Sequence, residues 1–139
     1  MRQIIFLALI AVIHGQPAPV ILNGPADFED NPKVVAAMNT IQMLQTNRQT
    51  ASTHISAGFM FLPHDSRALT KEQFLRQVIN AGRFDPGLVI GSRTHVNIVM
   101  LEYQNGNKLS YFTVKCENIS DCEVRGGHET IIVYGDQRN

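Results

Sequence analysis

Histidine and carboxylate side chains are the groups in this sequence that could carry acid–base or metal chemistry. The histidines that follow residue 15 show no H-x-H or H-x-x-x-H spacing, so nothing local supports a metal site. The twelve acidic residues fall in expected caps, turns and tails, and Glu102 is the one acid that could face a pocket. We therefore predict no catalytic residue, no metal site and no bound cofactor. The four histidines are His54, His64, His95 and His128.

Two of these histidines and one tyrosine form a candidate polar pocket. His54 precedes the first predicted strand, and His95 shares the parity of Tyr103 within residues 88–104. Because alternate residues of a strand face the same side, His95 and Tyr103 could line one concave face. The alternative interpretation is that each histidine is a solvent-facing or structural residue. The candidate ligand-binding residues are therefore His54, His95 and Tyr103.

The chain has two cysteines, Cys116 and Cys122. In an oxidising compartment such a closely spaced pair favours a disulfide, which by loop entropy would stabilise the fold by about 2 kcal/mol. A redox site or half of a zinc site has less support, because redox pairs usually have C-x-x-C spacing and no histidine lies nearby. Asn118 opens an N-x-S sequon between the cysteines, which predicts a surface glycan there.

The N-terminus predicts the compartment. A positive start is followed by ten apolar residues, 4–13, a helix of which would span about 15 Å, half the hydrocarbon core of a bilayer. This length is typical of a secretory signal peptide. We predict a signal peptide over residues 1–15, with Ala18 as the rival cleavage site, and a secreted mature chain with no membrane segment. A buried N-terminal strand and an uncleaved anchor remain the alternatives.

Composition limits the remaining classes. The 139 residues suit one domain, and 44% are hydrophobic while 17% are charged, which favours a packed core over disorder. Twelve basic residues balance twelve acidic ones and are scattered singly. Nucleic-acid binding through a basic surface is therefore not expected.

Helical patterns occupy the first half of the chain. Residues 16–30 contain three prolines and predict an extended lead-in. Asn31-Pro32 is a helix start, and apolar residues then recur at helical spacing to about residue 48. Residues 49–57 predict a short second helix leading into a strand over 58–62. A capping box at Thr70 and Gln73 begins a helix over 70–81.

Strand patterns occupy the second half. Residues 88–104 form one long apolar run, which predicts a strand that is covered on both faces or bulged. Asn105-Gly106 predicts a hairpin, followed by a strand over 109–116. Gly126-Gly127 predicts another hairpin, and residues 128–134 complete it. The sequence therefore predicts one α+β domain over residues 31–134, with a tail over 135–139.

A short strand, Phe59-Met60-Phe61, followed by the capped helix of residues 69–74 is the local pattern that carries a resemblance. With the opening helix and the late strands, it resembles the nuclear transport factor 2-like fold, and most of all its small secreted animal members with SnoaL-like, polyketide-cyclase-type domains. The resemblance implies a cone-shaped, curved antiparallel sheet of four to six strands around the N-terminal helix, with two to three helices and an interior pocket. A cystatin-like fold is the rival, although the Q-x-V-x-G loop of cystatins is absent.

Three functions follow from this resemblance. Because each acidic residue has an ordinary structural interpretation, we expect a non-catalytic protein that binds a small hydrophobic molecule in the cone pocket. The first alternative is a protein–protein interaction module that forms a homodimer through its sheet face. It predicts exposed apolar residues on one face of strands 94–103 and 109–116. An isomerase or cyclase-type enzyme, which needs a buried histidine or carboxylate, is the other alternative.

The chain secreted from a eukaryotic host is expected to begin at Gln16, to contain an oxidised cysteine pair and to carry a glycan on Asn118. Intact mass spectrometry before and after reduction and enzymatic deglycosylation measures all three. Asn118→Gln is the control, and it should remove the glycan and leave the cleavage site unchanged. A chain that retains residues 1–15 would contradict the predicted signal peptide.

Overall fold

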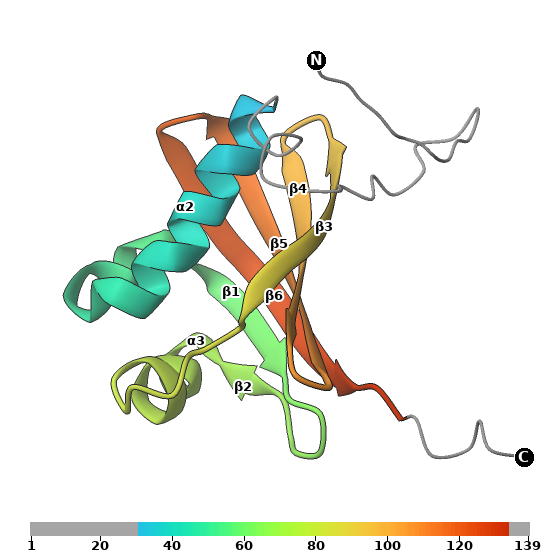
Figure 1. Ribbon diagram of the computed structural model, residues 1–139. Helices are drawn as coiled ribbons and strands as arrows, with labels where there is room; N and C mark the ends of the chain where they lie inside the picture. Colours follow the sequence, from blue (N-terminus) through green and yellow to red (C-terminus); the bar gives the residue numbers. More distant parts are fainter. Residues whose placement is uncertain (1–30, 134–139) are drawn as a thin grey trace, which may run out of the picture.

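The computed structural model describes residues 31–133. The predicted signal peptide over 1–15, the lead-in over 16–30 and the tail over 135–139 lie outside the described residues. Three helical segments accompany one six-stranded sheet, and Figure 1 shows helix α2 crossing one face of that sheet. The predicted α+β class, with a helix held against a curved sheet, is confirmed.

Helix α2 (Pro32–Thr46) begins where the sequence predicted. The side chain of Asn31 accepts hydrogen bonds from the backbone N–H groups of Lys33 and Val34, at 3.1 and 3.3 Å. Pro32 fits the first turn because its missing N–H would have no partner there. The helix ends two residues earlier than expected, and the 3₁₀ helix η1 (Arg48–His54) follows. The buried face of α2 consists of Val34, Ala36, Ala37, Thr40, Ile41 and Leu44.

The predicted capping box is present at the second α-helix. Strand β1 (Ile55–Leu62) and the short β2 (Leu69–Thr70) lead into α3 (Lys71–Phe74), which continues as a π-helical turn, η2 (Leu75–Ile79). The Gln73 backbone N–H donates to the Thr70 hydroxyl at 3.3 Å, and the Thr70 N–H donates to the Gln73 side chain at 3.0 Å.

The sheet has the strand order β2-β1-β6-β5-β4-β3. The remaining strands are β3 (Leu88–His95), β4 (Ile98–Asn105), β5 (Lys108–Asn118) and β6 (Asp121–Ile131). Consecutive strands from β3 to β6 pair antiparallel, as does β1 with β2. Strands β1 and β6 pair in parallel, so the sheet is mixed and not wholly antiparallel as predicted. Within residues 31–133, this pairing brings the first strand beside the last one.

The predicted single strand over 88–104 is wrong. The chain reverses at Val96 and Asn97, and His95 pairs with Ile98 across the resulting hairpin. Val96 adopts a φ of +55°, a conformation that β-branched residues rarely take. Glycine or asparagine would have marked such a turn in the sequence, whereas valine extends the apolar run and hides it.

The predicted hairpin at Gly126-Gly127 is also wrong, because both glycines lie inside strand β6. Gly127 pairs with Phe61 of β1 on one side and with Phe112 of β5 on the other. A Cβ atom on Gly127 would lie 2.6 Å from the carbonyl oxygen of Tyr111 and 2.7 Å from the Phe112 ring. Gly127 is therefore required for close packing inside the sheet, and it does not mark a turn.

Aromatic rings fill the interior between the sheet and the helices. The ring of Phe74 from α3 lies 4.9 Å from that of Phe59 and 5.2 Å from that of Phe61, measured between centroids. Phe61 and Phe112 stack at 5.8 Å across Gly127. Such contacts add to the burial of apolar area that stabilises the fold. Phe84 and Tyr103 complete the aromatic cluster.

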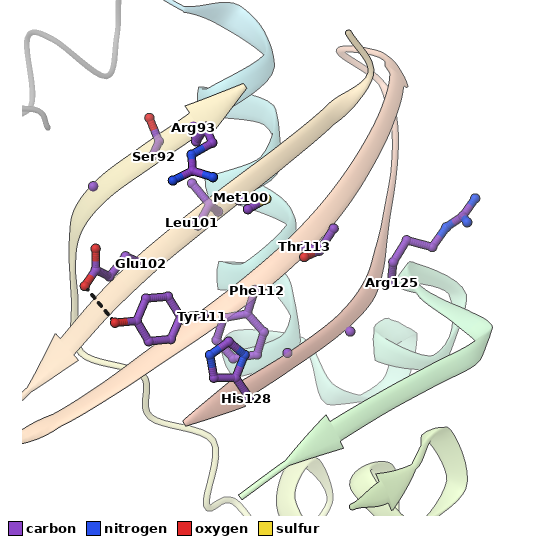
Figure 2. Close-up of a pocket in the computed structure, with 13 residues that line it drawn as sticks. Ser92, Arg93, Met100, Leu101, Glu102, Tyr111, Phe112, Thr113, Arg125 and His128 are labelled. Carbon is purple, nitrogen blue, oxygen red and sulfur yellow. Dashed lines mark hydrogen bonds between the residues drawn. The ribbon is translucent and has the colours of Figure 1, made fainter. Parts of the chain in front are cut away.

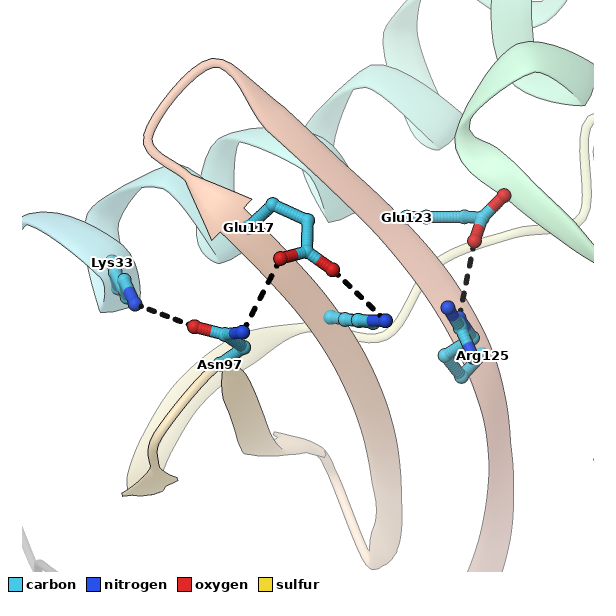
Figure 3. A network of polar contacts seen from close by, with 6 residues as sticks. Lys33, Asn97, Glu117, Glu123 and Arg125 are labelled. Atoms are coloured by element: carbon cyan, nitrogen blue, oxygen red, sulfur yellow. Dashed lines mark hydrogen bonds and ion pairs between the residues drawn. The ribbon is translucent and has the colours of Figure 1, made fainter.

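Two further links hold the ends of strands β5 and β6 and of helix α2. The predicted disulfide joins Cys116 to Cys122 across the β5–β6 hairpin and is confirmed. Figure 3 shows a chain of polar contacts from α2: the Lys33 ammonium donates to Asn97 at 3.0 Å, and the Asn97 amide donates to Glu117 at 3.3 Å. The ion pair with Lys115, at 2.9 Å, lowers the pKa of Glu117.

Within residues 31–133, no helix combines the length and the apolar character that spanning a bilayer requires.

Gly127→Ala is expected to destabilise the fold by about 1–3 kcal/mol, because its methyl group would overlap the Tyr111 carbonyl and the Phe112 ring. Gly58→Ala in β1 is the control, since its Cβ would meet no atom within 4 Å. The control should change the free energy of unfolding by less than about 1 kcal/mol, or raise it. Urea unfolding of the oxidised proteins measures both values, and equal midpoints would contradict the packing argument.

Candidate functional site

Tyr103, one of the predicted pocket residues, belongs to the interior of the protein. It is buried on the concave face of the sheet, and its ring contacts that of Phe112 edge to face at a centroid distance of 6.0 Å. Burial raises the pKa of the Tyr103 phenol. Burial therefore favours the neutral, protonated form of this phenol.

His95 and His54 lie apart from Tyr103 and from each other. His95 is exposed beside the turn at Val96, and its cross-strand partner Ile98 has the opposite parity to Tyr103 on β4. His54 is half-buried at the end of η1, beside a cleft of about 410 Å³ between α2 and the β5–β6 hairpin. The hidden turn breaks the parity that linked His95 to Tyr103, so the three residues do not line one pocket.

The interior retains a small cavity beside helix α3. This cavity has a volume of about 210 Å³ and lies between the sheet and the α3–η2 segment. Its walls include the rings of Phe61, Phe74 and Phe112, and Lys108 and Glu129 form a 3.9 Å ion pair at its edge. Pockets that enclose drug-sized ligands measure about 300–1,000 Å³. The interior cavity is smaller than this range, so it offers less room than the predicted binding of a ligand inside the cone would need.

A larger depression lies on the opposite face of the sheet, which we term the outer-face hollow. Its volume is about 470 Å³, and strands β3, β4, β5 and β6 all contribute to its lining. Figure 2 views this face with helix α2 behind the strands, and the side chains of Leu101 and Phe112, which also border the hollow, belong to the buried core. The side chains that form its floor and edges are Arg93, Met100, Glu102, Tyr111, Thr113 and His128.

The register of the sheet explains why this face is hollowed. One row across the strands runs from Arg93 through Met100 and Thr113 to Gly126. The next row begins at Gly91 and continues through Glu102, Tyr111 and His128. Each row ends in a glycine that presents no side chain, and the two glycines stand at opposite ends of the hollow. The sequence predicted an exposed face of these strands only as a protein–protein contact, and it did not indicate a hollow there.

Tyr111 forms a fixed aromatic wall of the hollow. Its ring stacks on the His128 imidazole with the centroids 4.6 Å apart and the planes 15° apart. Its hydroxyl donates a hydrogen bond of 3.1 Å to the Glu102 carboxylate. Burial, together with the charge and the hydrogen bond of Glu102, raises the pKa of the Tyr111 phenol. Glu102, the one acid predicted to be able to face a pocket, does so on the outer face and serves as an acceptor for Tyr111.

Arg93 carries an unsatisfied polar group in the hollow. Its Nε is buried and has no hydrogen-bond partner among residues 31–133. A buried donor without an acceptor costs about 1–3 kcal/mol, and more when it is charged. The other arginine of the lining, Arg125, is instead paired with Glu123 at 3.1 Å. Arg93 is therefore the group in the hollow that is best able to accept a new partner.

The described part of the chain holds no group of three histidine, cysteine, aspartate or glutamate side chains that could bind a metal ion.

Comparison with solved structures identifies the fold class. An NTF2-like protein from Cytophaga hutchinsonii has a TM-score of 0.54 and 14% identity, over 71% of this chain and 94% of that protein. An NTF2-like protein of unknown function from Pseudomonas putida has a TM-score of 0.52 and 5% identity, over 82% and 92% of the two chains. A cystatin-like domain of unknown function from Nostoc punctiforme has a TM-score of 0.52 and 9% identity, over 83% of each chain.

These similarities show that the chain has the NTF2-like fold, in agreement with the predicted resemblance. No protein-family model matches the sequence. No curated protein matches it either. Identities this low show the fold alone, and fold does not determine function. The function must therefore be argued from the outer-face hollow and the interior themselves.

Proposed function

We propose that this chain is a secreted, non-catalytic binding protein, akin to the small secreted animal members of the NTF2-like group, and that it holds a small hydrophobic molecule in the outer-face hollow. The predicted signal peptide over residues 1–15 supports secretion. The Cys116–Cys122 disulfide is consistent with an oxidising compartment. The Asn118 sequon also fits, because Asn118 is exposed at the end of β5.

The observation that carries this proposal is the contrast between the two faces of the sheet. Aromatic side chains line an interior cavity of about 210 Å³, and the cleft of about 410 Å³ beside His54 is lined mostly by polar residues, whereas the outer face offers about 470 Å³. The larger volume lies within the range of small-molecule sites. Its floor includes Met100, which is 39% exposed, beside the aromatic wall of Tyr111. A small apolar ligand would cover this surface and remove it from water.

The titratable groups of the hollow support a binding role over a catalytic one. A general base needs a free carboxylate or imidazole within hydrogen-bond reach of the substrate. The Glu102 carboxylate already accepts a hydrogen bond from Tyr111, and the His128 ring is stacked on that same tyrosine. The buried Tyr103 lies on the other face of the sheet. Glu102 and His128 thus both hold the aromatic wall of Tyr111, and for this reason we favour binding over catalysis.

Self-association through the outer face is a second candidate function. Met60 and Leu62 of β1 are 48% and 52% exposed, and they extend the apolar surface beyond Met100. Both face the same side as Gly126 and His128, their partners on β6. Exposed apolar surface on one face of a sheet is typical of a protein–protein contact. A homodimer would cover this surface with its own copy, as in an isologous interface.

Protein secreted from a eukaryotic host is expected to be a monomer that carries additional non-covalent mass in native mass spectrometry. Thr113→Tyr should abolish this mass, because the larger side chain projects into the hollow. Thr130→Tyr is the matched control, since Thr130 is exposed on β6 outside the hollow, and it should retain the mass. A ligand-free dimer that Thr113→Tyr dissociates would instead support self-association.

A further inference from the structure

We propose that the ligand of the outer-face hollow is a carboxylic acid with an apolar body, and that Arg93 binds its carboxylate. This inference rests on the proposed binding function and specifies the chemical class of the ligand. Two observations carry it: the guanidinium Nε of Arg93 has no hydrogen-bond partner among residues 31–133, and the surface beside it has room for an apolar body.

The unpaired charge is the guanidinium of Arg93. Its Nε is buried without an acceptor, and none of the three ion pairs found within residues 31–133 includes Arg93. A guanidinium presents its N–H groups as a planar fork that matches the two oxygens of a carboxylate. An incoming carboxylate would supply the missing acceptor and would balance the positive charge at the same time.

The other charged groups around the hollow are already engaged. Arg125 is exposed and donates to Glu123 at 3.1 Å, so its charge is balanced. Glu102 of β4 is the acid that lines the hollow, and its carboxylate accepts a hydrogen bond from the Tyr111 hydroxyl at 3.1 Å. The negative charge of Glu102 in the same hollow would repel a doubly charged phosphate more strongly than a carboxylate. A singly charged acid therefore fits better than a phosphate.

The surface beside Arg93 is suited to an apolar body. Met100 is the cross-strand neighbour of Arg93, and Thr113 and Gly126 follow in the same row. Gly126 carries no side chain, which leaves room over the β6 end of the row. The stacked rings of Tyr111 and His128 border this row as a flat wall, as Figure 2 shows. A ligand with its head group on β3 would thus lay its apolar chain across β4 and β5 toward β6.

The test uses decanoate and decanol, which share an apolar chain and differ in the head group. Isothermal titration near pH 7.5 should give decanoate an affinity about tenfold higher than that of decanol for the unmodified protein. Arg93→Gln should reduce this ratio to about one while decanol binding is retained, which also shows that the variant is folded. Arg93→Lys should retain part of the preference, because lysine keeps the charge and loses the fork.

Arg125→Gln is the matched control, since it removes the other arginine of the lining, and the decanoate preference should survive it. An unchanged preference in Arg93→Gln, or its loss in Arg125→Gln alone, would overturn the assignment of the carboxylate to Arg93 and leave the binding function intact. If neither probe binds, or if Thr113→Tyr leaves both affinities unchanged, the outer-face hollow is not the site. The proposed function and this inference would then fail together.

Discussion

Two adjacent glycines in the central strand β6 shape both faces of the sheet. Gly127 faces the interior between Phe61 and Phe112, and its missing side chain lets their rings stack at 5.8 Å. A Cβ at this position would lie 2.6 Å from the Tyr111 carbonyl oxygen, so the strands pack closely only around glycine. Because successive residues of a strand face opposite sides, Gly126 faces outward and leaves one end of the outer-face hollow open.

The close packing of the interior changes where function can reside in this fold. Phe74 from α3 lies against the rings of both β1 phenylalanines, and Phe84 and Tyr103 pack on Phe112. Once these rings fill the cone, little volume remains for a ligand, and a polar group placed there is desolvated, as the raised pKa of Tyr103 indicates. The hollow on the outer face has a different cause, because Gly91 and Gly126 present no side chains at its two ends.

Local signals in the sequence were sufficient for the helices, whereas the sheet register depended on information that the sequence hides. The Asn31-Pro32 start, the Thr70–Gln73 capping box and the Cys116–Cys122 pair are short-range chemistry, and the structure contains all three. The turn at Val96 has no such signal, and missing it reversed the facing of His95 relative to Tyr103. His95 and Tyr103 therefore face opposite sides of the sheet, because Ile98, the cross-strand partner of His95, has the opposite parity to Tyr103.

The two polar ends of the outer-face hollow differ in a way that gives the site a direction. Tyr111 satisfies Glu102 from the neighbouring strand, whereas the buried Nε of Arg93 has no partner within residues 31–133. A folded chain tolerates a buried donor without a partner when the favourable burial around it offsets the cost. A ligand that accepts this hydrogen bond removes that cost and binds more tightly for it. The asymmetry favours an anionic group at β3 and apolar contact toward β6, where Gly126 leaves space. The orientation of a bound molecule would thus depend on two groups: the Glu102 carboxylate, which already has a hydrogen-bond partner, and the Arg93 guanidinium, whose Nε has none.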